Sequence, residues 1–224
     1  MTTRPTVLLV LTSHDRLGDT GKPTGAYLSE VAHPYAVFAR QGFAVDFASP
    51  KGGRPPFDGT DRPDAVSRAL LDDRDVQQRL DRTLRPDEID PARYDAIFYA
   101  GGHGTMWDFP GDAGLAQLAA TIDAQGGVVA AVCHGPSALL EIKKADGSYL
   151  IAGREVAGFT NDEERAVKLD TVVPFLLADE LTKRGAIHKP GPNWQPHVIT
   201  SGRLVTGQNP ASATGVAEAV LRLI

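Results

Sequence analysis

The clearest feature of the chain is a series of short, mainly apolar runs rich in β-branched residues. They cover residues 6–11, 43–48, 94–100 and 128–132. A strand inside a parallel sheet is covered on both faces, so it lacks the alternation of a half-exposed strand. These runs therefore predict buried strands of a mostly parallel sheet.

Other segments carry apolar residues at intervals of three and four, which is the spacing of a helix that buries one face. Helices are expected at about residues 27–41, 65–84, 113–125, 136–143 and 211–224, with another inside 171–184. A further strand is expected at 155–159, and the pattern of 198–206 indicates a hairpin with Ser201-Gly202 at its turn.

Strands that alternate with helices predict βαβ units, and hence an α/β fold with a doubly wound sheet. The 224 residues contain no internal repeat, low-complexity tract or linker. A single domain over residues 1–224 is the expected organisation.

Charge and hydropathy exclude several classes of protein. A net charge of −5 argues against a nucleic-acid-binding protein, because such proteins need a basic face to offset phosphate charge. No apolar run approaches the roughly 20 residues that cross a bilayer as a helix. The apolar stretch at 7–11 is too short for a signal peptide, and no small-residue cleavage site follows it. A cytoplasmic protein without membrane or nucleic-acid partners is expected.

The one cysteine, Cys133, ends the run 128–132 and is followed by His134-Gly135-Pro136. A single cysteine excludes an intrachain disulfide and a cysteine-rich zinc site. Small residues on both sides suit a sharp strand-to-helix turn, where bulky neighbours would clash. A helix that begins just after the cysteine would lower the pKa of its thiol. The pattern predicts a reactive nucleophile, and the alternative is an inert buried cysteine at a tight turn.

Three further features are candidates to complete such a site. His134 is a base or acid near neutral pH if the turn folds it toward Cys133. The N–H groups of His134 and Gly102 are candidate oxyanion donors, and Gly101 beside them lets a ligand approach the backbone. Glu30 falls among apolar neighbours on its helix, where burial would raise its pKa and keep it protonated. The plain alternatives are a surface histidine, an ordinary glycine turn and a surface glutamate.

Several longer motifs extend from about residue 6 to the C-terminus. They are Thr-Gly-x-x-x-x-Glu30-x-x-His-Pro, Asp46-Phe-Ala-Ser-Pro, Ala-Gly-Gly-His-Gly-Thr, Ala-Val-Cys133-His134-Gly-Pro, Gly-Phe-Thr-Asn-x-Glu-Glu164 and Gly-Arg-Leu-Val-Thr-Gly-Gln-Asn-Pro-Ala-Ser. In combination they resemble the ThiJ/PfpI superfamily, and more narrowly its branch of heat-shock chaperones and glyoxalase III enzymes. The resemblance implies a flavodoxin-like three-layer sandwich, related to class I glutamine amidotransferase domains.

The resemblance also implies the roles of the site residues. Cys133 is then the nucleophile, His134 its basic partner and Glu30 the carboxyl hydrogen-bonded to the sulfur. An acidic residue that orients the histidine falls by motif position on Glu164, with Glu163 as the alternative.

Two differences from related proteins limit the activity and the cofactors that we expect. A glutamine amidotransferase carries a His-x-Glu pair downstream of its cysteine, but here His188 precedes Lys-Pro and His197 precedes Val-Ile. Larger chaperone members carry a metal site, whereas His14, His33 and His103 show no convincing ligand spacing. No cofactor and no metal are therefore expected.

The predicted activity is that of a glutathione-independent glyoxalase III (D-lactate dehydratase), acting on methylglyoxal or a similar small dicarbonyl. Cys133 would add to the aldehyde as a hemithioacetal, the amides of Gly102 and His134 would hold the oxyanion, and Glu30 or His134 would move a proton through an enediol. The alternatives are a cysteine hydrolase of peptidase or amidase type, and a stress holdase or cysteine redox sensor. The resemblance further implies a homodimer.

Overall fold

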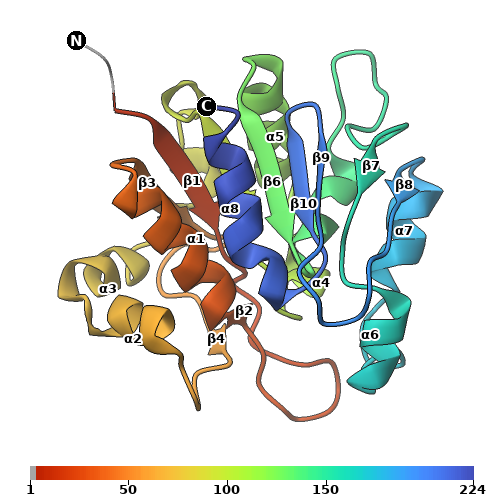
Figure 1. Cartoon of the computed structure of the whole chain (residues 1–224), viewed down its shortest axis with the longest axis horizontal. Helices are drawn as coiled ribbons and strands as arrows, with labels where there is room; N and C mark the ends of the chain where they lie inside the picture. The colour runs from red at the N-terminus through yellow and green to blue at the C-terminus, as the bar shows by residue number, and fades with distance from the viewer. Residues whose placement is uncertain (1–3) are drawn as a thin grey trace.

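A six-stranded sheet forms the centre of the structure, a computed structural model that describes residues 4–224. Residues 1–3 of the expected domain lie outside the described residues. In spatial order the strands are β3 (Ala44–Ala48), β1 (Thr6–Val10), β5 (Ala96–Tyr99), β6 (Val128–Val132), β10 (Leu204–Gly207) and β9 (Val198–Ser201). Neighbours pair in parallel except β9 and β10, which form the expected antiparallel hairpin (Figure 1).

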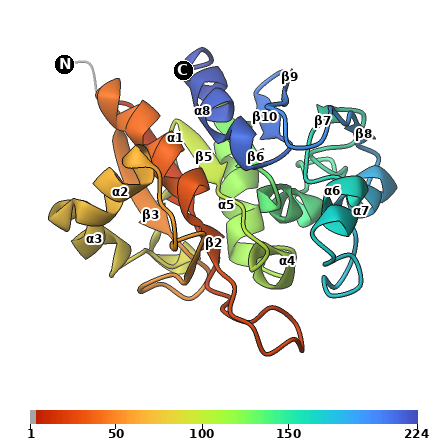
Figure 2. The ribbon, with the colours of Figure 1, turned by 60° about the horizontal axis from the view of Figure 1, so that its bottom comes forward.

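Helices cover both faces of this sheet, as the alternation of strands and helices predicts. α1 (Leu28–Arg40) and α8 (Ala213–Leu221) pack against each other on one face, and α5 (Ala113–Ala124) packs against β5 and β6 on the other (Figures 1 and 2). The central strands are fully buried. Their continuous apolar sequences follow from this double cover.

The smaller elements lie around this sandwich. Among the short helices are α4 (Thr105–Asp108), α6 (Asn161–Ala166) and α7 (Leu177–Lys183). Two pairs of two-residue strands are also present: β2 (Ala26–Tyr27) with β4 (Phe57–Asp58), and β7 (Glu155–Val156) with β8 (Ile187–His188). The strand expected at 155–159 therefore ends early, because the N–H of Ala157 donates to the side chain of Thr206 at 2.8 Å instead of to a neighbouring strand.

The charged stretch 65–84, expected as one helix, forms two: α2 (Ala65–Asp72) and α3 (Arg74–Leu80). Asp73 separates them in an extended conformation, with φ −77° and ψ 105°. Its carboxylate accepts the N–H groups of Asp75 and Val76 at 3.0 and 3.1 Å. An aspartate that caps a new helix in this way ends the preceding one.

The segment after β6 is also not the α-helix expected over 136–143. Gly135–Glu141 form a 3-10 helix. The carbonyl of His134 accepts the N–H of Ser137 at 3.0 Å, and it also accepts the hydroxyl of Thr105 at 3.1 Å. These two donors hold the first turn at the tighter i→i+3 spacing.

The register of the sheet brings the ends of β5, β6 and β10 together. Tyr99 lies beside Ala131 and Gly207 beside Val132, so the residues that follow β5 and β6 meet at one edge. In open α/β sheets this carboxyl edge is where ligands bind.

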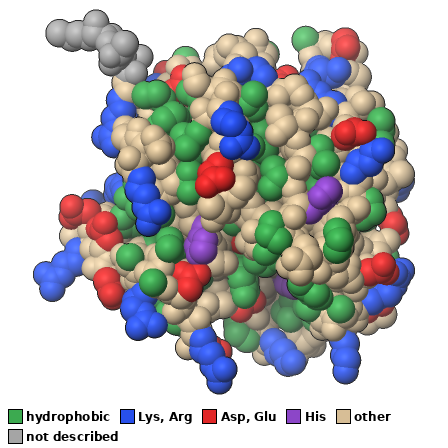
Figure 3. Space-filling view, viewed as in Figure 1, with side chains coloured by type: hydrophobic (Ala, Val, Ile, Leu, Met, Phe, Trp, Pro, Cys, Tyr) green, Lys and Arg blue, Asp and Glu red, His purple; other side chains and the backbone are tan. Residues whose placement is uncertain are grey.

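The outer surface is charged, unlike the buried carboxyl edge of the sheet. On the face that carries α1 and α8, side chains of both charges are interspersed (Figure 3). Within residues 4–224, no helix has both the length and the apolar character needed to cross a bilayer. Cys133 and His134 are only 3% and 1% exposed, so their side chains lie below the surface.

Candidate active site

Cys133 sits on a strained turn directly after β6. Its φ of +60° is left-handed, a conformation that non-glycine residues rarely adopt. Both of its backbone groups are held: its N–H donates to Gly207 and its carbonyl accepts the N–H of Phe159, each at 2.9 Å. A Cβ at Gly135 would lie 2.4 Å from the carbonyl oxygen of Tyr99, so the turn requires a small residue there. The strain is thus fixed by the surrounding chain, as in a nucleophile elbow.

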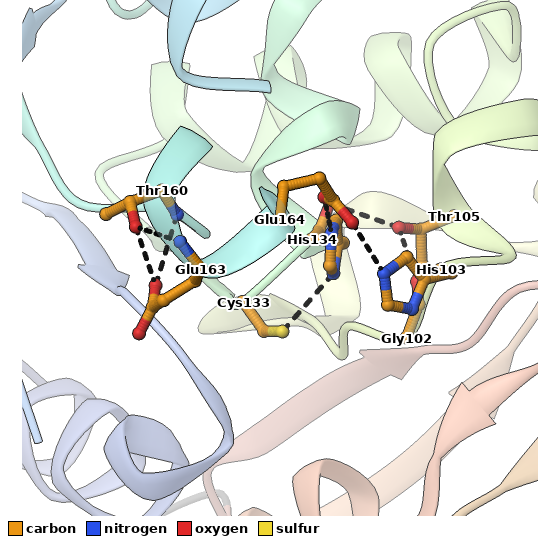
Figure 4. Close-up of polar contacts among 8 residues, drawn as sticks. All are labelled: Gly102, His103, Thr105, Cys133, His134, Thr160, Glu163 and Glu164. Carbon is orange, nitrogen blue, oxygen red and sulfur yellow. Dashed lines mark hydrogen bonds and ion pairs between the residues drawn. The ribbon is translucent and has the colours of Figure 1, made fainter. Parts of the chain in front are cut away.

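The turn folds His134 toward the cysteine. Nδ1 of His134 lies 3.4 Å from Sγ of Cys133, and Nε2 lies 2.7 Å from Oε2 of Glu164 (Figure 4). A carboxylate only accepts hydrogen bonds, so it takes the Nε2 hydrogen and leaves the Nδ1 lone pair facing the sulfur. The three side chains therefore form a Cys-His-Glu arrangement in which the histidine can accept the thiol proton.

The neighbouring carboxylates Glu163 and Glu164 of α6 point to different partners. Oε2 of Glu163 accepts the N–H of Thr160, the residue that caps α6, at 3.1 Å. Its Oε1 accepts the N–H of Trp194 and the amide of Asn209, each at 2.9 Å. Glu163 thus joins α6 to two distant segments, and Glu164 is the residue bonded to His134.

Glu30 projects from α1 toward the cysteine. Its side chain is fully buried, and its Oε2 accepts the N–H of Gly101 at 2.9 Å. Burial raises the pKa of Glu30 to about 8, although hydrogen bonds to Cys133 and Gly101 oppose the rise. The carboxyl is therefore protonated at neutral pH and can donate its hydrogen toward the sulfur.

The two glycines after β5 have different uses. A Cβ at Gly101 would lie 2.3 Å from Oε2 of Glu30 and 2.9 Å from Cβ of Cys133, so this position needs glycine. Its N–H is already bonded to Glu30, which removes Gly101 as an oxyanion donor. Among the described residues the N–H of Gly102 donates to no backbone carbonyl, and the N–H of His134 is directed at the sulfur of Cys133. These two amides remain the candidate oxyanion donors.

His103 is the residue that sequence patterns did not place in the site. Its Nε2 lies 2.9 Å from Oε1 of Glu164, and its ring centroid is 4.1 Å from that of His134 (Figure 4). Glu164 therefore lies between two imidazoles. The only sequence signal was the position of His103 directly after the glycine pair.

Burial sets the charge state of the imidazole and its partner. Burial, and then the neighbouring His103, lower the pKa of His134 to about 4, against the opposing pull of Glu164. Burial also acts to raise the pKa of Glu164, but hydrogen bonds from His103 and His134 outweigh it and lower that pKa to about 2. Near neutral pH the pair is thus a neutral imidazole beside an ionised carboxylate.

The expectation of a lowered thiol pKa was wrong. Burial, and then the Glu30 carboxyl, raise the pKa of Cys133, and only the amide of His134 opposes them in part. The thiol therefore needs a base to become nucleophilic, and His134 is in position to supply it.

Comparison with known proteins shows which family the chain belongs to. The model of the DJ-1/PfpI family matches residues 23–223. The chain belongs to the DJ-1/PfpI family. This confirms the resemblance to the ThiJ/PfpI superfamily.

Similar proteins cover nearly the whole of this DJ-1/PfpI chain. The glutathione-independent glyoxalase HSP31 of Saccharomyces cerevisiae is 36% identical over 227 residues, which span 94% of each chain. Rapid Encystment Protein 24 KDa of Francisella tularensis superposes with a TM-score of 0.95 at 38% identity over 98% of each chain. Glyoxalase III of Candida albicans superposes with a TM-score of 0.91 at 31% identity, covering 98% of this chain and 97% of that one. These likenesses confirm the expected α/β fold.

One group of donor atoms in this DJ-1/PfpI chain is compact enough for a metal ion. Among the described residues, ligand atoms of His103, His134 and Glu164 lie within 4.8 Å of one another. Both Nε2 atoms, however, carry hydrogens that they donate to Glu164, and a metal needs their lone pairs. We therefore assign no metal to the group. Sequence spacing did not reveal it, because its members come from three separate segments.

An aromatic layer covers the imidazole of His134. The ring of Phe159 lies 4.3 Å from that of His134, and Trp194 contacts Phe159 edge-on at 5.8 Å. Trp194 is 46% exposed, whereas Phe159 is 4% exposed. The layer keeps water from one side of His134, which strengthens the hydrogen bonds beneath it.

Proposed function

We propose that this DJ-1/PfpI protein is a glutathione-independent glyoxalase III-type lyase that converts methylglyoxal to lactate. The observation that carries the proposal is the chain of contacts from Cys133 through His134 to Glu164, built on a strained turn beside a protonated Glu30. Support comes from the names of similar proteins, which include the glutathione-independent glyoxalase of Saccharomyces cerevisiae and glyoxalase III of Candida albicans.

The first step forms a bond between enzyme and substrate. The thiol of Cys133 passes its proton to Nδ1 of His134 as the sulfur attacks the aldehyde carbon. The carbonyl electron pair moves to the aldehyde oxygen, where the N–H groups of Gly102 and His134 stabilise the developing charge. The imidazolium then returns the proton to that oxygen, which gives a hemithioacetal and restores a neutral His134.

The second step moves hydrogen between the two substrate carbons. Neutral His134 removes the proton from the former aldehyde carbon while Glu30 donates its proton to the ketone oxygen, and an enediol results. His134 then delivers its proton to the former ketone carbon, and the hydroxyl on the sulfur-bearing carbon returns a proton to Glu30. One carbon is oxidised and the other reduced, so the product is a lactoyl thioester and no external oxidant is needed. Water then cleaves the thioester and releases lactate and the thiol.

Lactate formation from methylglyoxal tests the proposal, with glutathione omitted and a chelator present. The wild type is expected to produce lactate, and Cys133→Ala is expected to produce none. Cys133→Ser preserves the size of the side chain and controls for damage to the strained turn. A folded wild type that releases no lactate would overturn the proposal.

The cysteine hydrolase would use the same three side chains, so activity on peptide or ester substrates in the absence of lactate would favour it.

The proposed homodimer is checked by analytical ultracentrifugation. The proposed cytoplasmic location is checked by cell fractionation.

A further inference from the structure

Glu164 binds two imidazoles, and the proposed mechanism uses only one of them. Oε2 accepts the Nε2 hydrogen of His134 at 2.7 Å, and Oε1 accepts that of His103 at 2.9 Å (Figure 4). The side chain of Glu164 is 3% exposed, so water does not compete strongly for either oxygen. Each oxygen is thus held by a separate ring.

The fold fixes His103 firmly in this position. His103 follows Gly102, whose φ is +107° and where a Cβ would lie 2.1 Å from the carbonyl oxygen of Gly25. Its ring meets that of Phe159 edge-on at 6.1 Å and is 17% exposed. The turn that presents the Gly102 amide therefore also presents the ring of His103.

The two rings cannot both be charged without cost. Their centroids are 4.1 Å apart, so two imidazolium ions would repel each other while they share one negative charge. A carboxylate that served His134 alone would favour its protonated form. Because Glu164 also accepts a hydrogen bond from His103, it stabilises the protonated form of His134 less strongly.

The other titratable groups near His134 are carboxyls, a thiol and a phenol. Cys133 faces Nδ1, and Glu163 lies next to Glu164 on α6. Glu30 and Tyr27 lie near the sulfur of Cys133. None of these described groups becomes positively charged on protonation, whereas the imidazole of His103 does. The lowered pKa of His134 is consistent with this placement, since burial is its first cause and His103 its second.

We propose that His103 is a positioning residue of the active site, which holds Glu164 in place and keeps His134 neutral, because a second positive charge so close to the His103 ring is disfavoured. Nδ1 of His134 is then free to accept the thiol proton at neutral pH. This role rests on the proposed function, in which His134 is the base, and it adds a fourth side chain to the Cys-His-Glu arrangement.

The test compares two substitutions of His103 by two measurements. His103→Gln keeps an N–H donor for Glu164 but has no charge, and His103→Phe keeps a ring but has no donor. The first measurement is the titration of the His134 imidazole by nitrogen-15 NMR, with its signal assigned by His134→Gln. The second is the pH profile of kcat/KM for lactate formation. His33→Gln on α1 is the control, because His33 is bonded to Asp64 and Thr214 and not to the site.

In His103→Gln, we expect His134 to titrate about one pH unit higher than in the wild type. The acid limb of kcat/KM should move up with it, because His134 must be neutral to act. In His103→Phe, kcat should fall about tenfold or more at every pH, since Glu164 loses the donor that holds it. His33→Gln should leave both measurements unchanged.

An unchanged His134 titration in His103→Gln, folded by circular dichroism, would overturn the inference whatever the activity. The NMR measurement needs no turnover, so it tests the proposed role of His103 even if the wild type forms no lactate. A wild type without lactate would reject the proposed function alone.

Discussion

The N–H of Gly101 donates to the carboxyl of Glu30 at 2.9 Å, so the end of β5 holds the carboxyl group that lies against Cys133. A Cβ at position 101 would lie 2.3 Å from the accepting oxygen and 2.6 Å from the carbonyl oxygen of Val132. Contacts this short leave no room for any side chain. A glycine that sequence patterns suggested for substrate contact therefore serves the packing of the site itself.

Gly101→Ala should consequently displace Glu30 from Cys133. We expect a loss of about 1–3 kcal/mol in the free energy of unfolding, the usual cost of overpacking a core, and a severe loss of lactate formation. Denaturant unfolding and the lactate assay measure the two effects. Gly111→Ala is the matched control, because a Cβ there meets nothing within 4 Å and no change is expected. Equal behaviour of the two variants would contradict the close packing at position 101.

Glu30→Gln should make the protein more stable at neutral pH and less active. The pKa of Glu30 is raised by burial from 4.5 to about 8, so the unfolded chain ionises this group over a range where the folded protein keeps it protonated. Stability is therefore lost as pH rises from about 4.5 toward 8, and a neutral glutamine avoids that loss. The gain should reach about 3 kcal/mol near pH 7 and vanish below about pH 4.5.

Denaturant unfolding at several pH values measures this gain, and a gain independent of pH would contradict the protonated state of Glu30. Lactate formation should fall about 100-fold or more in the same variant, because glutamine cannot exchange the proton that the substrate oxygens require.

Substitutions of the adjacent residues Glu163 and Glu164 should have different effects, one on stability and the other on catalysis. Glu164→Gln removes the acceptor that fixes the His134 tautomer, and kcat should fall about 100-fold or more. Glu163→Gln should instead destabilise the protein by about 1–3 kcal/mol, since the buried amide of Asn209 and the partly buried N–H of Trp194 lose their charged acceptor. The folded Glu163 variant should keep kcat within about tenfold of the wild type. Comparable losses of kcat in both folded variants would contradict the assignment of Glu164 as the partner of His134.

Features that depend on neighbours in the sequence could be predicted, and features that depend on distant contacts could not. The buried strands follow from continuous apolar runs, and small residues around Cys133 revealed its turn. The role of His103 was missed because its partner Glu164 lies 61 residues away. The 3-10 helix after β6 depends on a hydroxyl from another segment, Thr105. The thiol pKa was predicted in the wrong direction because the degree of burial is a property of the folded protein.

Trapping of an acyl-enzyme tests the central claim most directly, because a lactoyl thioester on Cys133 distinguishes covalent catalysis from simple proton transfer. Turnover of methylglyoxal is stopped with acid and free methylglyoxal is removed, because hydroxylamine would otherwise condense with its carbonyl groups to form oximes. Hydroxylamine added to the recovered protein then attacks a thioester and releases a lactoyl hydroxamate, whereas a hemithioacetal would not give this product. The wild type is expected to yield the hydroxamate, and Cys133→Ala is expected to yield none. Lactate formed at an undiminished rate by Cys133→Ala, without hydroxamate from either protein, would contradict the account.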